Sequence, residues 1–186
     1  MITLIYGGSS SGKSEYAEKL VCSTGYKNKY YLATMKHSDD AKDRIMRHRK
    51  LRQGKGFVTL EHDVDIVNAI SEIDNIDSGD FSTNKADLNG EIVLLECMSN
   101  LVANEMFRDG EIYSADACVA KILSDVKELE ERVSSLVIVT NNVFEDGISY
   151  DVGTKEYLRA LGAINRKLAA VAEEVYEVVV GIGIRL

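Results

Sequence analysis

The stretch "ITLIYGGSSSGKSEYAEKLVCS", residues 2–23, joins an apolar run, a turn of glycine and serine, and a segment with helical periodicity. Its residues 7–14 fit the pattern G-x-x-x-x-G-K-[ST], with the fixed positions held by Gly7, Gly12, Lys13 and Ser14. Glycines let the backbone curl so that successive N–H groups point at phosphate oxygens, and the next helix adds the positive end of its dipole. Lys13 is then expected to reach the β- and γ-phosphates, and the Ser14 hydroxyl is placed for Mg²⁺. A turn of this composition can match by chance, but a strand before it and a helix after it favour a nucleotide-binding loop.

Beyond this loop, apolar runs alternate with helix-period segments, which predicts an α/β domain with a mainly parallel sheet flanked by helices. A chain of 186 residues fits one domain spanning residues 1–186. Strands are expected at residues 2–6, 29–34, 56–62, 92–96 and 135–141, with one or two more from residue 174. After the helix that ends near Gly25, helices are expected at residues 39–53, at about 63–73, after residue 97, at 112–133 and at 152–173. The polar residues 74–91 are expected to form an exposed loop.

Composition excludes several classes of protein. The formal net charge of −8 argues against general nucleic-acid binding, which needs a broad basic face. No apolar run reaches the roughly 18 residues of a membrane span, and the N-terminus lacks the pattern of a signal peptide. The three cysteines, Cys22, Cys97 and Cys118, are far apart and form no CxxC pair, so buried free thiols in a reducing cytoplasm are expected.

A carboxylate at the end of a neighbouring strand is the second part that a P-loop protein needs, because it holds Mg²⁺ or its waters. The apolar run "IVLLE" ends in Glu96. A glutamate at a strand end can also be a solvated edge residue. Because the strand before it is so apolar, we favour the functional interpretation, with Ser14 and Glu96 as the magnesium site.

The segment "DRIMRHRKLRQGK", residues 43–55, concentrates six of the 22 lysines and arginines of this acidic chain around His48. On a helix, Arg44, His48 and Arg52 share one face because of their i, i+4, i+8 spacing. Nearby cations lower the pKa of an imidazole, which keeps the ring neutral and nucleophilic at pH 7. The same pattern fits a solvated helix face, a general acid or base, or a phosphate contact. The residues alone leave these four interpretations open.

Taken together, the motifs resemble one known family. The segments that carry the resemblance are, in chain order, "GGSSSGKS", "YLAT", "RIMRHRKLR", "TLE", "LLECMSNLVANEMF", "VIVTN" and "GAINRKLAAVAEEVYEVVVGIGIRL". They are similar to the bifunctional adenosylcobinamide kinase/adenosylcobinamide-phosphate guanylyltransferases of cobalamin biosynthesis, over essentially the whole chain. The resemblance implies a RecA-like P-loop domain, usually a homotrimer, that uses ATP or GTP with Mg²⁺.

The resemblance also implies two reactions and a set of site residues. Adenosylcobinamide is phosphorylated, and GMP is then transferred from GTP to adenosylcobinamide phosphate through a GMP–histidine intermediate, with release of pyrophosphate. His48 falls on the catalytic histidine. The implied nucleotide-binding residues are Gly7, Gly8, Ser9, Ser10, Ser11, Gly12, Lys13, Ser14, Ala33, Thr34, Met35, Arg49, Lys50, Leu51, Arg52, Glu61 and Glu96.

The sequence departs from the family pattern outside these nucleotide segments. After "VTN" the family usually continues with Glu-Val-Gly, where this chain has "NVFEDGISYD". Leu158 and Arg159 stand where an Arg-Asp pair is expected. Two other classes therefore stay open: a P-loop small-molecule kinase without a covalent step, and a non-enzymatic nucleotide-binding regulatory module.

Overall fold

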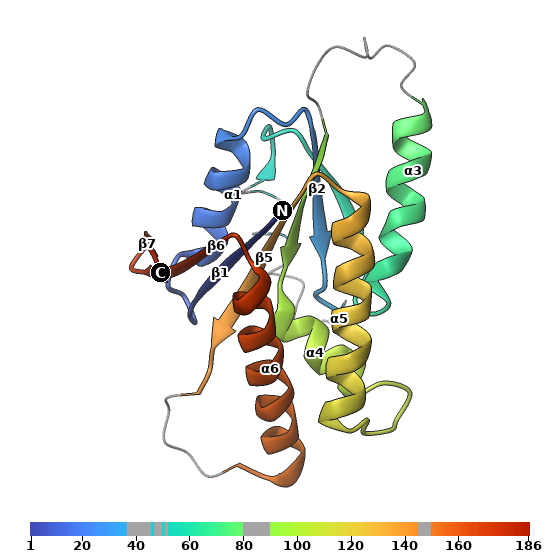
Figure 1. Ribbon diagram of the computed structural model, residues 1–186, viewed down its shortest axis with the longest axis vertical. Helices are drawn as coiled ribbons and strands as arrows, with labels where there is room; N and C mark the ends of the chain where they lie inside the picture. Colours follow the sequence, from blue (N-terminus) through green and yellow to red (C-terminus); the bar gives the residue numbers. More distant parts are fainter. Residues whose placement is uncertain (37–45, 47–49, 51, 80–89, 145–149) are drawn as a thin grey trace.

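The computed structural model describes residues 1–36, 46, 50, 52–79, 90–144 and 150–186. Within this part, seven strands form one sheet in the order β3-β2-β4-β5-β1-β6-β7 (Figure 1). All neighbouring strands pair in parallel except β6 and β7, which form an antiparallel hairpin. The strands are β1 (Ile2–Gly8), β2 (Asn28–Ala33), β3 (Phe57–Glu61), β4 (Glu91–Glu96), β5 (Ser135–Asn142), β6 (Glu174–Val179) and β7 (Ile182–Arg185).

Helices cover both faces of this sheet (Figure 1). The described helices are α1 (Lys13–Ser23), the 3₁₀ helix η2 (Ile66–Asn68), α3 (Ala69–Gly79), α4 (Met98–Met106), α5 (Ala115–Arg132) and α6 (Val152–Val171). One core cluster lies between the sheet and α1, and a larger one lies between the sheet and η2, α3, α4, α5 and α6. The predicted α/β class with a mainly parallel sheet is confirmed, and none of the described helices is long and apolar enough to span a membrane.

Burial explains why the central strands were visible in the sequence. In β1, β4 and β5, residues on both faces are buried, so the strands read as continuous apolar runs. The strand β5 lies between β1 and β4, which agrees with the RecA-like architecture that the resemblance implied. The carboxyl ends of β1, β4 and β5 therefore meet at one edge of the sheet, where the P-loop also lies.

The prediction of a loop over residues 74–91 is wrong for its first part. The helix expected to end near residue 73 continues as α3 to Gly79, so the first part of the predicted loop 74–91 is helical. Ile70, Ile73 and Ile76 recur at i, i+3 and i+6 and keep one face apolar, and Asp74 forms an ion pair with Arg132 of α5. The polar residues Asp74 and Asn75 therefore lie on the exposed face of a helix and do not belong to a loop. Residues 80–89 and most of the predicted helix 39–53 lie outside the described part of the chain.

The prediction of buried thiols is confirmed for Cys97 and Cys118 and is wrong for Cys22. Cys22 lies in the last turn of α1 and is exposed.

Candidate nucleotide-binding site

The turn between β1 and α1 has the geometry that its two fixed glycines allow. Gly12 has a φ of 88°, and a Cβ on it would lie 2.9 Å from the Cα of Gly181 in the β6–β7 turn. A Cβ on Gly7 would lie 2.7 Å from both the Ser11 Oγ and the Val178 carbonyl oxygen. A side chain fits at neither position, because real Cβ atoms do not approach other atoms so closely. The loop is therefore closed against the C-terminal hairpin, with the N-terminus of α1 behind it.

Lys13 lies inside this loop. Its side chain is buried, and its Nζ donates to the Gly8 carbonyl oxygen at 3.0 Å. Burial lowers the pKa of Lys13, while the nearby Glu96 carboxylate acts in the opposite direction. The ammonium group is thus held within the turn, where the motif predicts the phosphates.

The structure brings Ser14 and Glu96 together, as the magnesium-site prediction requires. The Ser14 hydroxyl, in the first turn of α1, donates to Oε1 of Glu96 at the end of β4, with an O···O distance of 2.8 Å. Glu96 is partly exposed as a residue, but its Oε2 is enclosed and has no hydrogen-bond partner among the described residues. Burial raises the pKa of Glu96 to about 7, against the opposing effects of the Ser14 hydrogen bond and the Lys13 charge.

These two groups fit a bound Mg²⁺. In nucleotide sites, Mg²⁺ takes one or two protein oxygens and completes its shell with phosphate oxygens and water. The Ser14 hydroxyl and the free carboxylate oxygen of Glu96 supply that number of ligands beside the predicted phosphate position. A bound cation would also favour the ionised form of Glu96, which burial disfavours.

Thr34 supports Glu96 from the neighbouring strand. Its amide donates to the Glu96 carbonyl oxygen at 3.0 Å, and its hydroxyl exchanges hydrogen bonds of 2.8 Å with the backbone of Cys97. Thr34 is fully buried, so its hydroxyl is already used in joining β2 to β4. Ala33 lies level with Glu61 on one side and Glu96 on the other. Ala33, Glu61 and Glu96 therefore lie at the same edge of the sheet. Thr34 holds the backbone at Glu96 and Cys97 in place.

Other predicted nucleotide-binding residues line a groove at the edge strand β3. Lys50, Arg52 and Glu61 share this groove of about 820 Å³. The Arg52 guanidinium carbon lies 3.5 Å from the ring centroid of Tyr31, and its Nη1 is buried without a hydrogen-bond partner in the described structure. Its charge also favours the ionised form of Glu96 and so links this groove electrostatically to the P-loop. His48, Arg49 and Leu51 lie outside the described residues, so their placement stays a prediction.

Sequence reasoning missed two polar residues at this site. Glu18 of α1 is almost fully buried, and it forms an ion pair of 2.6 Å with Lys55. Asn141, the second-last residue of β5, pairs with Gly7 of β1. It donates to the Ser99 hydroxyl at 2.5 Å and has a buried Oδ1 without a described partner. The polar end of the apolar run "VIVTN" was the available signal for Asn141, whereas no local pattern indicates that Glu18 faces inward.

The P-loop lies between the strand β1 and the helix α1, and its serine, Ser14, is hydrogen-bonded to a carboxylate at the end of a second strand. This arrangement is typical of P-loop nucleotide-binding proteins. The sequence model of a family described as "Cobinamide kinase / cobinamide phosphate guanyltransferase" matches residues 3–186. The chain belongs to this family, which confirms the resemblance drawn from the motifs.

Individual relatives agree with this assignment. The chain is 28% identical over 195 residues to the "Bifunctional adenosylcobalamin biosynthesis protein CobU" of Escherichia coli (strain K12), covering 100% of this chain and 99% of that protein. It is 27% identical, with the same coverage, to the protein of the same name from Salmonella typhimurium strain LT2. Among solved structures, the flagellar accessory protein FlaH from Methanocaldococcus jannaschii matches with a TM-score of 0.45 and 13% identity, over 95% of this chain and 70% of that one.

Proposed function

We propose that this chain catalyses two successive steps of nucleotide-loop assembly in cobalamin biosynthesis. It phosphorylates adenosylcobinamide with ATP or GTP, and then transfers GMP from GTP to adenosylcobinamide phosphate, giving adenosylcobinamide-GDP and pyrophosphate. The observation that carries the proposal is the family match over residues 3–186. The hydrogen bond between Ser14 and Glu96 beside the P-loop supports it, because these two side chains could bind the Mg²⁺ that both reactions use.

In the kinase step, the protein positions the phosphates and neutralises their charge, which is most of what phosphoryl transfer requires. The backbone N–H groups of the loop and the N-terminus of α1 receive the phosphate oxygens. Lys13 leaves the Gly8 carbonyl oxygen and donates to the phosphates instead. A bound Mg²⁺, held by Ser14 and Glu96, would neutralise charge on the β- and γ-phosphate oxygens.

In the transferase step, His48 is the nucleophile. A neutral imidazole nitrogen attacks the α-phosphorus of GTP, an N–P bond forms, and the bond to the bridging oxygen breaks so that pyrophosphate leaves. A phosphate oxygen of adenosylcobinamide phosphate then attacks the same phosphorus and releases the histidine. The covalent intermediate divides one difficult displacement into two easier ones. The cations of residues 43–55 keep the ring unprotonated and hold the triphosphate.

The test is labelling of the full-length protein with GTP that carries ³²P at the α-phosphate, followed by denaturation. We expect protein-bound label that is labile in acid, stable in alkali and lost in His48→Ala. Phosphorylation of adenosylcobinamide by His48→Ala, measured in parallel, shows whether the variant is still folded and active as a kinase. Kinase activity without labelling of the wild type would instead favour a P-loop kinase with no covalent step. Absence of both activities would favour a nucleotide-binding module.

We further propose that the protein is a cytoplasmic homotrimer. The family resemblance supports this assembly, and so do the apolar side chains exposed on and around the β6–β7 hairpin, which are Val179, Val180, Ile182, Ile184 and Leu186.

A further inference from the structure

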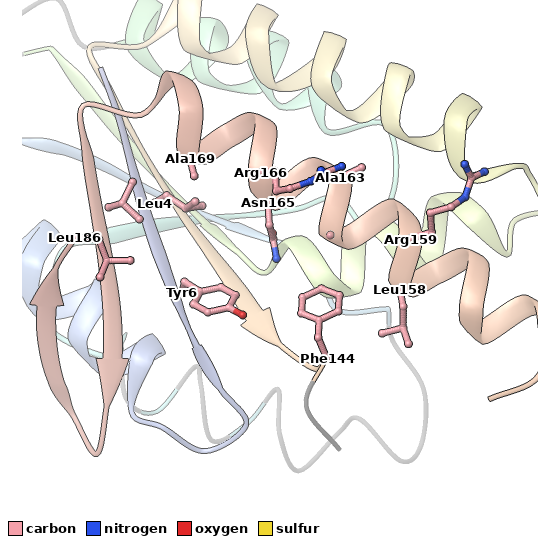
Figure 2. Close-up of a pocket in the computed structure, with 12 residues that line it drawn as sticks. Leu4, Tyr6, Phe144, Leu158, Arg159, Ala163, Asn165, Arg166, Ala169 and Leu186 are labelled. Atoms are coloured by element: carbon pink, nitrogen blue, oxygen red, sulfur yellow. The ribbon is translucent and has the colours of Figure 1, made fainter. Parts of the chain in front are cut away.

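A second groove lies on the opposite face of the sheet from α1, between α6 and the strands β1 and β6. It has a volume of about 600 Å³, within the range of about 300–1,000 Å³ that is usual for small-molecule sites. Its walls are mostly apolar, with the two aromatic rings of Tyr6 and Phe144 (Figure 2). Arg166 stands exposed among the groove residues. Among the described residues, none of the P-loop lines this groove.

A buried amide in this groove has an unused hydrogen-bond donor. Asn165 of α6 is 9% exposed, and its Oδ1 accepts from the Thr140 hydroxyl at 2.7 Å. Its Nδ2 is enclosed and has no partner among the described residues. Figure 2 shows this nitrogen directed toward the space between Tyr6 and Phe144. An amide N–H buried without a partner costs on the order of 1–3 kcal/mol, so the arrangement suits a ligand that supplies an acceptor.

The groove adjoins the nucleotide site. Tyr6 lies directly before Gly7, the first residue of the P-loop, and it pairs in register with Thr140. Successive strand residues point to opposite faces, so Tyr6 faces the groove while Gly7 faces the phosphate loop. Phe144 follows the carboxyl end of β5 and packs over Gly162 of α6, at 3.6 Å from the position of a Cβ on that glycine. One end of the groove therefore lies near the sheet edge that carries the P-loop.

We propose that this groove binds the corrinoid acceptor, with Asn165 Nδ2 donating to one of its carboxamide oxygens. Cobinamide is a macrocycle with methyl groups and primary amides on its rim, which matches apolar and aromatic walls around one buried donor. Its edge occupies the groove after Phe144, which is 40% exposed, rotates away from Asn165. The acceptor hydroxyl then approaches the nucleotide past Tyr6. This inference rests on the function proposed above and adds the location of the second substrate.

Two variants and one matched control test it in the full-length protein. Asn165→Asp keeps the oxygen that accepts from Thr140 and replaces only the free donor. Ala163→Phe fills the groove, whereas Ala170→Phe places the same ring on the exposed side of α6, outside the groove lining. Binding of adenosylcobinamide is measured by equilibrium dialysis without nucleotide, and binding of a fluorescent GTP analogue is measured separately. Thermal melting and molar mass by light scattering accompany each variant.

We expect corrinoid affinity to fall about tenfold or more in Asn165→Asp and in Ala163→Phe, with GTP binding unchanged and with Ala170→Phe behaving as the wild type. Unchanged corrinoid affinity in folded Asn165→Asp and Ala163→Phe overturns the assignment. A change of molar mass in Ala163→Phe, with corrinoid binding intact, also overturns it and places a second copy of the chain at the groove. A wild-type protein that neither binds nor phosphorylates adenosylcobinamide refutes the proposed function itself, which is a distinct result.

Discussion

The buried carboxyl group of Glu96 should make the stability of this protein depend on pH in a defined way. Its pKa is raised from 4.5 to about 7 because the folded protein buries the charged form. Between these two pH values the folded state binds a proton that the unfolded state has lost. The free energy of unfolding therefore receives its full contribution from this group below pH 4.5 and loses it as the pH rises toward about 7.

The substitution Glu96→Gln isolates this effect. Gln keeps a carbonyl oxygen as the acceptor for the Ser14 hydroxyl but has no proton to lose. At 1.36 kcal/mol per pKa unit, raising the pH from 5 to 8 would cost the wild type about 2.5 kcal/mol relative to the variant. Because Glu96 is partly exposed, we reduce this figure to about 2 kcal/mol. The side-chain NH₂ group that Gln introduces also changes the free energy of unfolding, but this contribution is the same at every pH.

The assay is urea denaturation followed by circular dichroism at pH 5, 6, 7 and 8, without nucleotide or Mg²⁺. The measured quantity is the difference in the free energy of unfolding between Glu96→Gln and the wild type, so the titrations of other groups cancel. Glu131→Gln, which removes an exposed carboxylate of α5, serves as the control and should stay within about 0.5 kcal/mol at every pH. If the difference for Glu96→Gln does not vary between pH 5 and 8, Glu96 does not have the raised pKa.

Contacts of Ser14 and of the buried Glu105 can be tested in the same way. Ser14→Ala removes the hydroxyl that donates to the Glu96 carboxylate. It should abolish the Mg²⁺-dependent increase in affinity for a fluorescent GTP analogue while leaving Mg²⁺-independent binding within about threefold. An equal response to Mg²⁺ in wild type and variant would contradict the magnesium assignment. Lys121→Met removes the ammonium group that lies 2.8 Å from the buried Glu105, which keeps Arg108 at 3.4 Å as its remaining cation. Because one partner remains and Lys121 is partly exposed, the variant should cost about 1–3 kcal/mol in urea denaturation at pH 7. Lys127→Met, which breaks an exposed pair on the same helix, should cost less than about 0.5 kcal/mol, and similar losses in the two lysine variants would sink this argument.

Much of the nucleotide side of the fold was predictable because its signals are local. The P-loop pattern, the buried central strands and the carboxylate at the end of β4 each occupy a few consecutive residues, and each appears where it was expected. The end of α3 was not predictable from composition, since Asp74 and Asn75 in its second half are polar and exposed. Glu18 was missed for a related reason. Its ion-pair partner, Lys55, lies 37 residues further along the chain.

The family and the fold class were thus determined by the sequence, because motif spacing and hydrophobic periodicity are properties of neighbouring residues. The contacts of these residues with distant parts of the chain, and their burial, were determined only by the tertiary structure. Ser14 and Glu96 are 82 residues apart, and their contact exists because the strand order places β4 and β1 on either side of β5. The raised pKa of Glu96 and the free amide of Asn165 follow from burial, which no single segment determines. The second groove likewise forms only where β1, α6 and the C-terminal hairpin come together.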